Sequence, residues 1–282
     1  MALLPTAGLT APASSAHGAA DLEHRVAEYQ RHLDVKQKGV DICILMDWTG
    51  SMASCIEAAK AKALEVMGAA PKVHPDAITR LAFVGYRDHC DGTDRLVVHD
   101  FVTSRGFEGL QAAVGRVVAK GGGDAAEDVA GGLEAVLGLS WSSSTRLLIH
   151  MGDCPAHGKC YHAGLNDDHP GGDPRGLVPE ELLKQMVVNR IDYHFGRITS
   201  HTDVYNDSPG ATAFEIHVSS VQQLVFCWTL KDPAADFKPL VLKSITSSMR
   251  RSFRSGSVSS GSSSSSAMGD LGLMPAVYTP LV

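Results

Sequence analysis

The sequence predicts an α/β fold built on a doubly wound, mainly parallel central sheet flanked by helices. Two observations lead to this fold class. The segment over 40–46 is a nearly unbroken apolar run, which is typical of a parallel strand buried on both faces, and 145–153 is predicted to be a second buried strand. Strand-like runs also alternate along the chain with longer segments of helical periodicity. Such alternation implies βαβ units with right-handed crossovers and a mainly parallel sheet.

Each expected element follows from its own residue pattern. Expected strands cover 40–46, 81–89, 95–102, 145–153 and 191–198. Expected helices cover 53–67, 107–119, 126–139, 177–190 and 235–252. The helix over 53–67 follows a Thr49-Gly50-Ser51 turn, whose hydroxyl groups can cap its first backbone amides. Between 203 and 234 the pattern leaves strand and helix open.

The ends of the chain differ in composition from its middle. Residues 1–20 are rich in Ala, Ser, Pro and Gly, and ten of the fifteen residues over 252–266 are serine. Such segments cannot bury enough apolar surface to fold. We therefore expect a disordered leader over 1–20, a short helix over 21–38, one folded domain over 39–252 and a disordered serine-rich tail over 253–282.

Composition excludes several classes of protein. With 282 residues and 44% hydrophobic content the chain can fill a sizeable core, and a net charge of -6 argues against a general nucleic-acid binder. The six cysteines have no framework spacing, and neither a secretory signal nor a run long enough for a membrane span is present. A cytoplasmic protein is the simpler expectation, and export without a recognisable signal is the alternative.

Polar side chains follow the two strongest strands. Asp47 ends the first apolar run, Asp153 ends the run over 145–153, and Thr49 and Ser51 stand in the turn after Asp47. The carboxyl ends of parallel strands meet at one edge of a sheet, where ligands bind. Carboxylate and hydroxyl oxygens with room for water are the ligands that Mg²⁺ prefers. The pattern predicts a divalent-cation site at this edge.

These residues also resemble a known family. An apolar strand followed by D-W-T-G-S, with a later strand ending in Asp, resembles the metal-ion-dependent adhesion site (MIDAS) of von Willebrand factor A (VWA) domains, which are Rossmann-like. Similarity is greatest to the VWA domains of the alpha-type protein kinase VwkA group and of hemicentin-like proteins. It spans about 40–250 and is carried by the blocks DICILMDWTGSM, AFVGYRDHCDG, GGGDAAEDVAGGLEAVL, TRLLIHMGDCPAHG, DDHPGGDP and IDYHFGRIT.

The resemblance implies a metal-assisted binding site without catalysis. Thr49 and Ser51 would ligate Mg²⁺ or Mn²⁺ through their hydroxyl groups, with Asp47 and Asp153 close to the ion directly or through water. An acidic side chain of a protein partner would complete the coordination.

The third loop of this sequence departs from the family pattern. Its usual threonine ligand corresponds to Ala125, whose methyl group cannot coordinate a metal. Either water replaces the threonine, or Asp124 or Asp128 compensates, or the site is weakened or empty.

Other groups of residues point to weaker alternatives. Zinc binding is conceivable at Cys154, His157, Cys160 and His162, although their spacing fits no closed zinc knuckle. The resemblance instead implies that His157 and His162 order their loop. The loop over 167–176, which contains Asp168 and Asp173, could hold calcium but more simply is a solvated loop.

Three further alternatives carry less weight. A Cys154 nucleophile lacks a recognisable oxyanion hole. The Lys120-Gly-Gly-Gly-Asp turn lacks the ending of a nucleotide-binding loop. A basic helix end near Arg250, Arg251 and Arg254 could bind a partner, but a solvated last helix is the simpler interpretation.

The leading functional expectation is a non-catalytic interaction module. Only about thirty residues follow the last expected helix, which is too few for a kinase domain of the VwkA type. The alternatives are a regulatory subunit that acts with a separate alpha-type kinase, and a secreted adhesion protein. The sequence does not identify the partner, the oligomeric state or the occupancy of the cation site.

Overall fold

The computed structural model describes residues 24–26, 39–54, 56–73, 77–162, 164–197, 225–229, 239 and 241–249. The expected leader over 1–20 and tail over 253–282 lie outside these residues, as does the basic segment after 249. Of the expected helix over 21–38, residues 24–26 are described, and they are helical. No helix of the described residues is long and apolar enough to cross a membrane.

The described strands form one six-stranded sheet, with order β3-β2-β1-β4-β5-β6. Neighbouring strands are parallel except for the antiparallel pair β2 and β3. Their bounds are β1 Val40–Asp47, β2 Thr79–Tyr86, β3 Leu96–Val102, β4 Thr145–Gly152, β5 Ile191–Arg197 and β6 Val225–Thr229.

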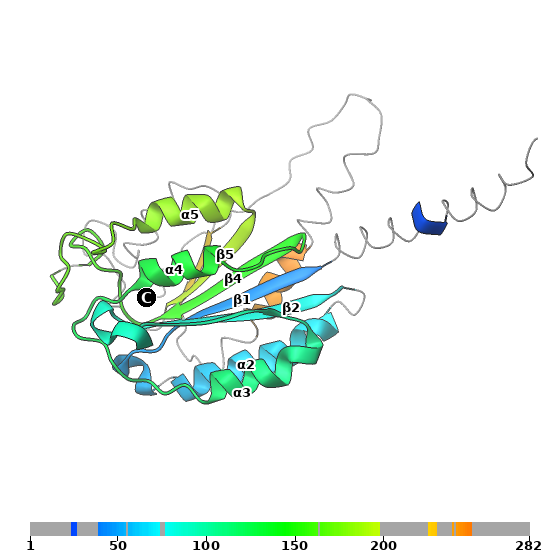
Figure 1. The fold of residues 1–282 in the computed structure, drawn as a ribbon, viewed down its shortest axis with the longest axis horizontal. Coiled ribbons are helices and arrows are strands. Elements are labelled where there is room, and N and C mark those ends of the chain that lie inside the picture. Colours follow the sequence, from blue (N-terminus) through cyan, green and yellow to red (C-terminus); the bar gives the residue numbers. More distant parts are fainter. Residues whose placement is uncertain are drawn as a thin grey trace, which may run out of the picture.

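Helices cover both faces of this sheet, with α2 and α3 below it and α4 and α5 above it in the view of Figure 1. Their bounds are α2 Ile56–Val73, α3 Phe107–Gly115, α4 Val129–Leu137 and α5 Pro179–Val188. The 3-10 helices are η1 Gly50–Ser54, η2 His89–Asp94 and η3 Ser104–Gly106. A further helix over 241–249 packs with α2 and α3 in the same hydrophobic core.

Side chains of β1 alternate between the two cores that these helices complete. Ile42, Ile44 and Met46 point to the core shared with α2 and α3, whereas Cys43 and Leu45 point to the core shared with α4 and α5. All of them are fully buried. The unbroken apolar run is therefore explained by burial on both faces of a central strand.

The expected α/β class with a mainly parallel sheet is confirmed, and its elements differ from expectation mainly at their ends. Helix α4 begins at Val129 because the Asp128 carboxylate accepts a hydrogen bond from the Gly131 amide and caps the helix. Helix α3 ends at Gly115, four residues before the expected 119. Within the ambiguous region over 203–234, the described residues form β6.

The sheet order reverses between β1 and β4, because β2 and β3 extend to one side of β1 while β5 and β6 extend beyond β4. A reversal point of this kind opens a crevice at the carboxyl ends of the two central strands. Asp47 is the last residue of β1, and Asp153 directly follows β4. The two aspartates expected to be neighbours thus end adjacent, hydrogen-bonded strands.

Trp48 anchors the loop that leaves β1. Its side chain is fully buried and its ring centroid lies 4.8 Å from that of Phe83. Gly85 lies beneath the indole, where a Cβ atom would come within 2.4 Å of the ring carbon Cε3. The Trp48 amide also donates to the Tyr86 carbonyl at 2.9 Å. The residues on either side of Trp48 are consequently held in place by core packing.

Candidate cation site

Four of the residues predicted for a cation site form a continuous chain of oxygen contacts. Asp47 Oδ1 accepts hydrogen bonds from the Thr49 amide at 2.9 Å and from the Thr49 hydroxyl at 2.7 Å. Thr49 Oγ1 lies 2.9 Å from Ser51 Oγ, which donates to Asp153 Oδ1 at 3.1 Å. The structure therefore brings Asp47, Thr49, Ser51 and Asp153 together at the carboxyl edge of β1 and β4.

The second carboxylate oxygen of Asp47 is in a different situation. The Asp47 side chain is fully buried, and Oδ2 has no hydrogen-bond partner among the described residues. Burial, and then the neighbouring Asp153 carboxylate, raises the pKa of Asp47 to about 8. Burying an ionised carboxylate oxygen without a partner is costly, so the Asp47 carboxyl stays protonated at neutral pH when no cation lies beside it.

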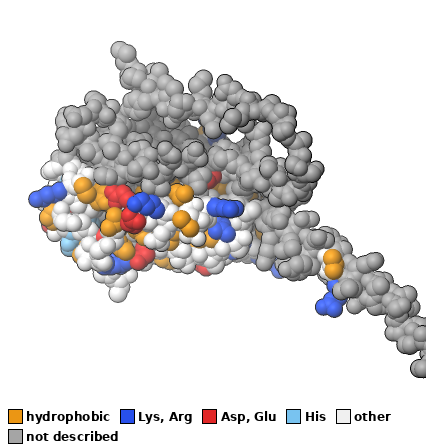
Figure 2. Space-filling view, turned by 90° about the horizontal axis from the view of Figure 1, so that it is seen from above, with side chains coloured by type: hydrophobic (Ala, Val, Ile, Leu, Met, Phe, Trp, Pro, Cys, Tyr) orange, Lys and Arg blue, Asp and Glu red, His pale blue; other side chains and the backbone are white. Residues whose placement is uncertain are grey.

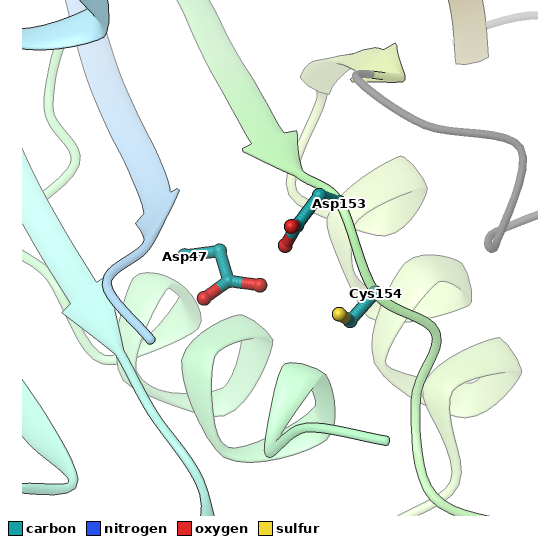
Figure 3. A group of neighbouring side chains, drawn as sticks. All are labelled: Asp47, Asp153 and Cys154. Carbon is teal, nitrogen blue, oxygen red and sulfur yellow. The ribbon is translucent and has the colours of Figure 1, made fainter. Parts of the chain in front are cut away.

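Cys154 adds a sulfur atom to the same group. The carboxylates of Asp47 and Asp153 and the thiol of Cys154 converge on a common space (Figure 3), and one donor atom from each lies within 4.8 Å of the others. Cys154 is buried, and its Sγ lies 3.8 Å from Ser51 Oγ. Burial and the Asp153 carboxylate raise the pKa of the thiol, so the sulfur stays protonated when no cation is bound.

Glu127 is a third carboxylate that the sequence analysis missed. It is buried, and its Oε2 has no hydrogen-bond partner among the described residues. Burial, and then the charge of Asp47, raises the pKa of Glu127 to about 10. Its amide donates to the Pro155 carbonyl at 2.9 Å, which fixes the third loop beside the loop after β4. The sequence feature that could have revealed Glu127 is an acidic residue that directly follows two alanines shortly before α4.

Asp124 and Ala125 lie elsewhere in the third loop. Asp124 Oδ1 accepts from the Ala126 amide at 2.9 Å, and Oδ2 accepts from the amide of Asp168, whose side chain is exposed. One ligand atom of Asp124 lies within 4.8 Å of one each from Asp88 and His157, and Asp124 is not in the group that contains Asp47. Ala125 offers no side-chain donor. For Glu127, after burial, the charge of Asp47 is the largest cause of the raised pKa.

Asp128 and Asp173 belong to a separate polar group with His89. Asp128 caps α4 and also accepts from Arg95 at 2.8 Å, while Asp173 Oδ2 lies 3.2 Å from His89 Nε2. Arg95 Nη1 lies 3.1 Å from His89 Nδ1. Because a guanidinium only donates, Nδ1 accepts and a neutral ring carries its proton on Nε2. Among the described residues neither His89 Nε2 nor Asp173 Oδ2 forms a hydrogen bond, and His89, Asp128 and Asp173 each place one candidate ligand atom within 4.8 Å of the others.

His157 forms a bridge between two loops instead of a zinc ligand set. Its Nε2 lies 2.9 Å from Asp88 Oδ1 and its Nδ1 lies 2.8 Å from Asp167 Oδ1. His162 Nε2 lies 3.0 Å from the other oxygen of Asp167. Burial lowers the pKa of His157, but the hydrogen bonds to Asp167 and Asp88 outweigh it and the net shift is upward.

The sequence motif around Cys154 is consequently split. His157 and His162 contact aspartates, Cys160 is exposed, and Cys154 faces Asp47 and Asp153. Among the described residues, no candidate metal group contains Cys154 together with either histidine. The imidazoles order the loop, which leaves the sulfur of Cys154 with the carboxylates.

The described surface shows no extended region of one charge on the face drawn in Figure 2. Basic, acidic and hydrophobic side chains alternate over the coloured part of that face. This distribution fits the overall net charge of -6 and gives no support to a nucleic-acid interface there.

Comparisons with known proteins identify a partial relative and a shared fold. No protein-family model matches the chain. Alpha-protein kinase vwkA from Dictyostelium discoideum is 34% identical over 160 residues, which cover 56% of this chain and 25% of that protein. The chain therefore matches about a quarter of the length of this relative.

Among solved structures, the pilus adhesin SpaC from Lactobacillus rhamnosus GG superposes with a TM-score of 0.50 at 12% identity, covering 74% of this chain and 30% of SpaC. Proximal thread matrix protein 1 from the mussel byssus gives a TM-score of 0.49 at 15% identity, covering 76% of this chain and 47% of that protein. At such low identity the SpaC likeness concerns the fold alone. The chain is thus an α/β protein that shares a segment of sequence with an alpha-protein kinase.

Proposed function

We propose that this chain is a VWA-type binding module that holds Mg²⁺ or Mn²⁺ and captures an acidic side chain of a protein partner without catalysing a reaction. The observation that carries the proposal is Asp47 Oδ2, which is buried without a hydrogen-bond partner beside a second carboxylate. A divalent cation would compensate this charge, and the hydroxyl groups of Thr49 and Ser51 stand next to it.

The donor set fits a hard cation. Three buried carboxylic acids, those of Asp47, Glu127 and Asp153, lie close enough to interact: burial, and then the charges of the other carboxylates, raises the pKa of Asp47 and that of Glu127. Oxygen donors from carboxylates and hydroxyl groups suit Mg²⁺ and Mn²⁺. We assign Thr49 and Ser51 as hydroxyl ligands, with Asp47 and Asp153 acting directly or through water.

Glu127 takes part in this proposal in place of the missing threonine. Ala125 has no donor atom, whereas Glu127 lies in the same loop and its charge interacts most strongly with Asp47. An additional carboxylate lowers the net positive charge of the loaded site. The module should therefore hold its cation firmly and attract an acidic partner less strongly than a site of hydroxyl ligands would.

The bound cation would attract a carboxylate oxygen of the protein partner. The protein contributes a preformed binding surface, called the rim below, at the carboxyl ends of β1 and β4. Trp48 fixes the loop after β1, and the Glu127 amide fixes the loop before α4. A rigid rim reduces the conformational entropy lost on binding.

We place this activity in the cytoplasm. All four cysteines whose state is described are free, and two of them, Cys90 and Cys160, are exposed. Exposed free thiols are typical of a reducing compartment.

A second candidate is regulation of an alpha-type protein kinase. It is favoured by the 34% identity to part of an alpha-protein kinase. In that case the kinase would be the acidic partner, and alpha-kinase activity would co-purify with the tagged chain.

Cation titration of the purified chain tests the first half of the proposal. Mg²⁺ or Mn²⁺ should raise the melting temperature by mass action, by the equivalent of about 2.7 kcal/mol at a hundredfold excess over the dissociation constant. Asp47→Asn should abolish the response. Asp94→Asn, which changes an exposed carboxylate paired with Lys120, is the matched control and should keep it. A flat response of the unaltered chain would remove the cation from the function.

Peptide capture tests the second half. Beads carrying a glutamate-rich peptide should retain the chain in Mg²⁺ and release it in chelator, whereas the glutamine version of the peptide should retain none. Retention that survives both chelator and Asp47→Asn would contradict the proposal.

A further inference from the structure

The sulfur of Cys154 distinguishes this rim from a site made of oxygen donors alone. The Cys154 Sγ, one Asp47 carboxylate oxygen and one Asp153 carboxylate oxygen all lie within 4.8 Å of one another. The Sγ also lies 3.8 Å from Ser51 Oγ. Figure 3 shows the thiol directed toward the two carboxylates rather than into the hydrophobic core. The geometry presents three anionic or ionisable ligands and one hydroxyl group to a single point.

Two observations indicate that Cys154 belongs to a ligand site and is not simply a buried structural cysteine. Asp47 Oδ2 is fully buried and accepts from no donor among the described residues, and one oxygen of the Asp47 carboxylate lies within 4.8 Å of Cys154 Sγ and of an Asp153 oxygen. The histidines that could have drawn Cys154 into another site, His157 and His162, are both hydrogen-bonded to Asp167. Neither histidine therefore competes for the sulfur.

We propose that the site also takes a thiophilic divalent cation of the zinc class, with Cys154 Sγ as a direct ligand beside Asp47 and Asp153. This inference rests on the cation site of the proposed function and specifies a second kind of ion for it. Zinc accepts thiolate and carboxylate ligands in four-coordinate sites, whereas Mg²⁺ prefers oxygen ligands in six-coordinate sites. Sulfur–metal bond formation releases the thiol proton to solvent.

The two ions exclude each other. Both need the carboxylates of Asp47 and Asp153, so only one ion is bound at a time. With Ser51 or a water molecule as its fourth ligand, the zinc-class ion fills its preferred coordination without a partner's carboxylate. Zinc-class ions should therefore displace Mg²⁺ and reduce capture of the acidic peptide.

Co²⁺ provides the optical test, because a cobalt–thiolate bond absorbs in the near ultraviolet and a cobalt–oxygen bond does not. The background protein carries Cys90→Ser and Cys160→Ser, which remove the two thiols that are exposed among the four cysteines described as free. Stoichiometric Co²⁺ should produce the thiolate band in this background, and Cys154→Ser should abolish it. Zn²⁺ affinity, measured by competition with a chromophoric chelator, should fall at least about tenfold in Cys154→Ser, since loss of even an outer ligand contact costs that much. Mn²⁺ affinity should be unchanged.

Three outcomes separate this inference from the proposed function. Mn²⁺ binding without a cobalt–thiolate band, or a band that persists in Cys154→Ser, overturns the inference and leaves the proposed function intact. Failure of every cation to bind overturns both. A cobalt–thiolate band with no Mg²⁺-dependent peptide capture supports the inference and contradicts the proposed function. If Cys154→Ser does not fold, X-ray absorption of Cd²⁺ bound to the background protein tests the inference instead. Cadmium–sulfur scattering is expected, and cadmium–oxygen scattering alone would overturn the inference.

Discussion

Strand β1 has a fully buried aspartate near each end, Asp41 at its start and Asp47 at its finish. Asp41 accepts two hydrogen bonds from the guanidinium of Arg80, at 2.8 and 2.7 Å. It also accepts from the amides of Ser142 and Ser143, at 2.8 and 2.9 Å, and from the Ser143 hydroxyl at 2.6 Å. Asp47 has Thr49 as its donor on one oxygen, and on the other it has none.

The difference separates a structural carboxylate from a binding one. At Asp41 the protein itself supplies the cation and the hydrogen-bond donors, so the charge stabilises the fold. At Asp47 burial, and then the neighbouring Asp153 carboxylate, raises the pKa to about 8, so the side chain holds a proton at neutral pH unless a cation from outside replaces it. Two residues of one type, equally buried on one strand, should therefore respond in opposite ways when their charge is removed.

The largest expected effect is at Asp41. Asp41→Ala leaves Arg80 and the Ser142 and Ser143 amides without their buried acceptor, and should lower the free energy of unfolding by about 3–5 kcal/mol. Urea denaturation followed by circular dichroism measures this as a lower midpoint at constant slope. A loss below about 1 kcal/mol would mean that the ion pair does not stabilise the fold, and the comparison with Asp47 would fail.

Removing the carboxylate of Asp47 should change the free energy of unfolding in the opposite direction. In chelator-containing buffer at neutral pH, Asp47→Asn should raise the free energy of unfolding by about 1 kcal/mol, because the amide keeps an acceptor for Thr49 and, unlike the acid, needs no bound proton to stay uncharged when it is buried beside Asp153. The same denaturation experiment measures it. In saturating Mg²⁺ the order should invert, with the unaltered chain the more stable. A variant less stable than the unaltered chain in chelator would show that Asp47 is compensated within the protein.

The smallest expected change in the free energy of unfolding concerns the bridge that His157 forms with Asp88 and Asp167, where the protein itself supplies both the imidazolium and the carboxylates. The pKa of His157 is raised above its ordinary value of 6.5, so its contribution to stability is complete below about pH 6.5 and is lost as the pH rises through the folded-state pKa. The pKa of Asp88 and that of Asp167 are lowered, so their contributions are lost on acidification instead.

The measurement is the free energy of unfolding against pH for the unaltered chain and for His157→Gln. Above about pH 6.5 the unaltered chain should lose stability faster than the variant, and the two curves should converge in alkaline buffer. Asp47 and Glu127 titrate in both proteins, so they cancel in the difference. Parallel curves would mean that the imidazole is neutral in the folded protein.

Much of the fold could be predicted because burial leaves a direct mark on the sequence. The apolar run ending in Asp47 and the run ending in Asp153 predicted neighbouring parallel strands, and β1 does pair with β4. The antiparallel direction of β3 is explained by its short connection, which runs from Tyr86 to Leu96 and cannot contain the helix that a parallel crossover needs.

The candidate site was predictable where its residues follow a strand, and less so where they depend on contacts between loops. Asp47 is the last residue of β1, and Thr49 and Ser51 follow it within one short loop, so their positions could be inferred from the strand pattern. Glu127 reaches the site through its backbone contact with Pro155, and Cys154 is available because His157 contacts aspartates. Such long-range pairings between irregular segments leave no periodic pattern in a single sequence.

The packing of Trp48 on Gly85 links the evolution of two positions that are distant in the chain. Any side chain at 85 would bring its Cβ to 2.4 Å from the indole, so position 85 is free to vary only after Trp48 has been replaced by a smaller residue. Because Trp48 stands between Asp47 and Thr49, that replacement would occur inside the cation loop itself. A lineage that keeps this loop should therefore keep glycine at 85, and a lineage that loses glycine there should show drift in the loop as well.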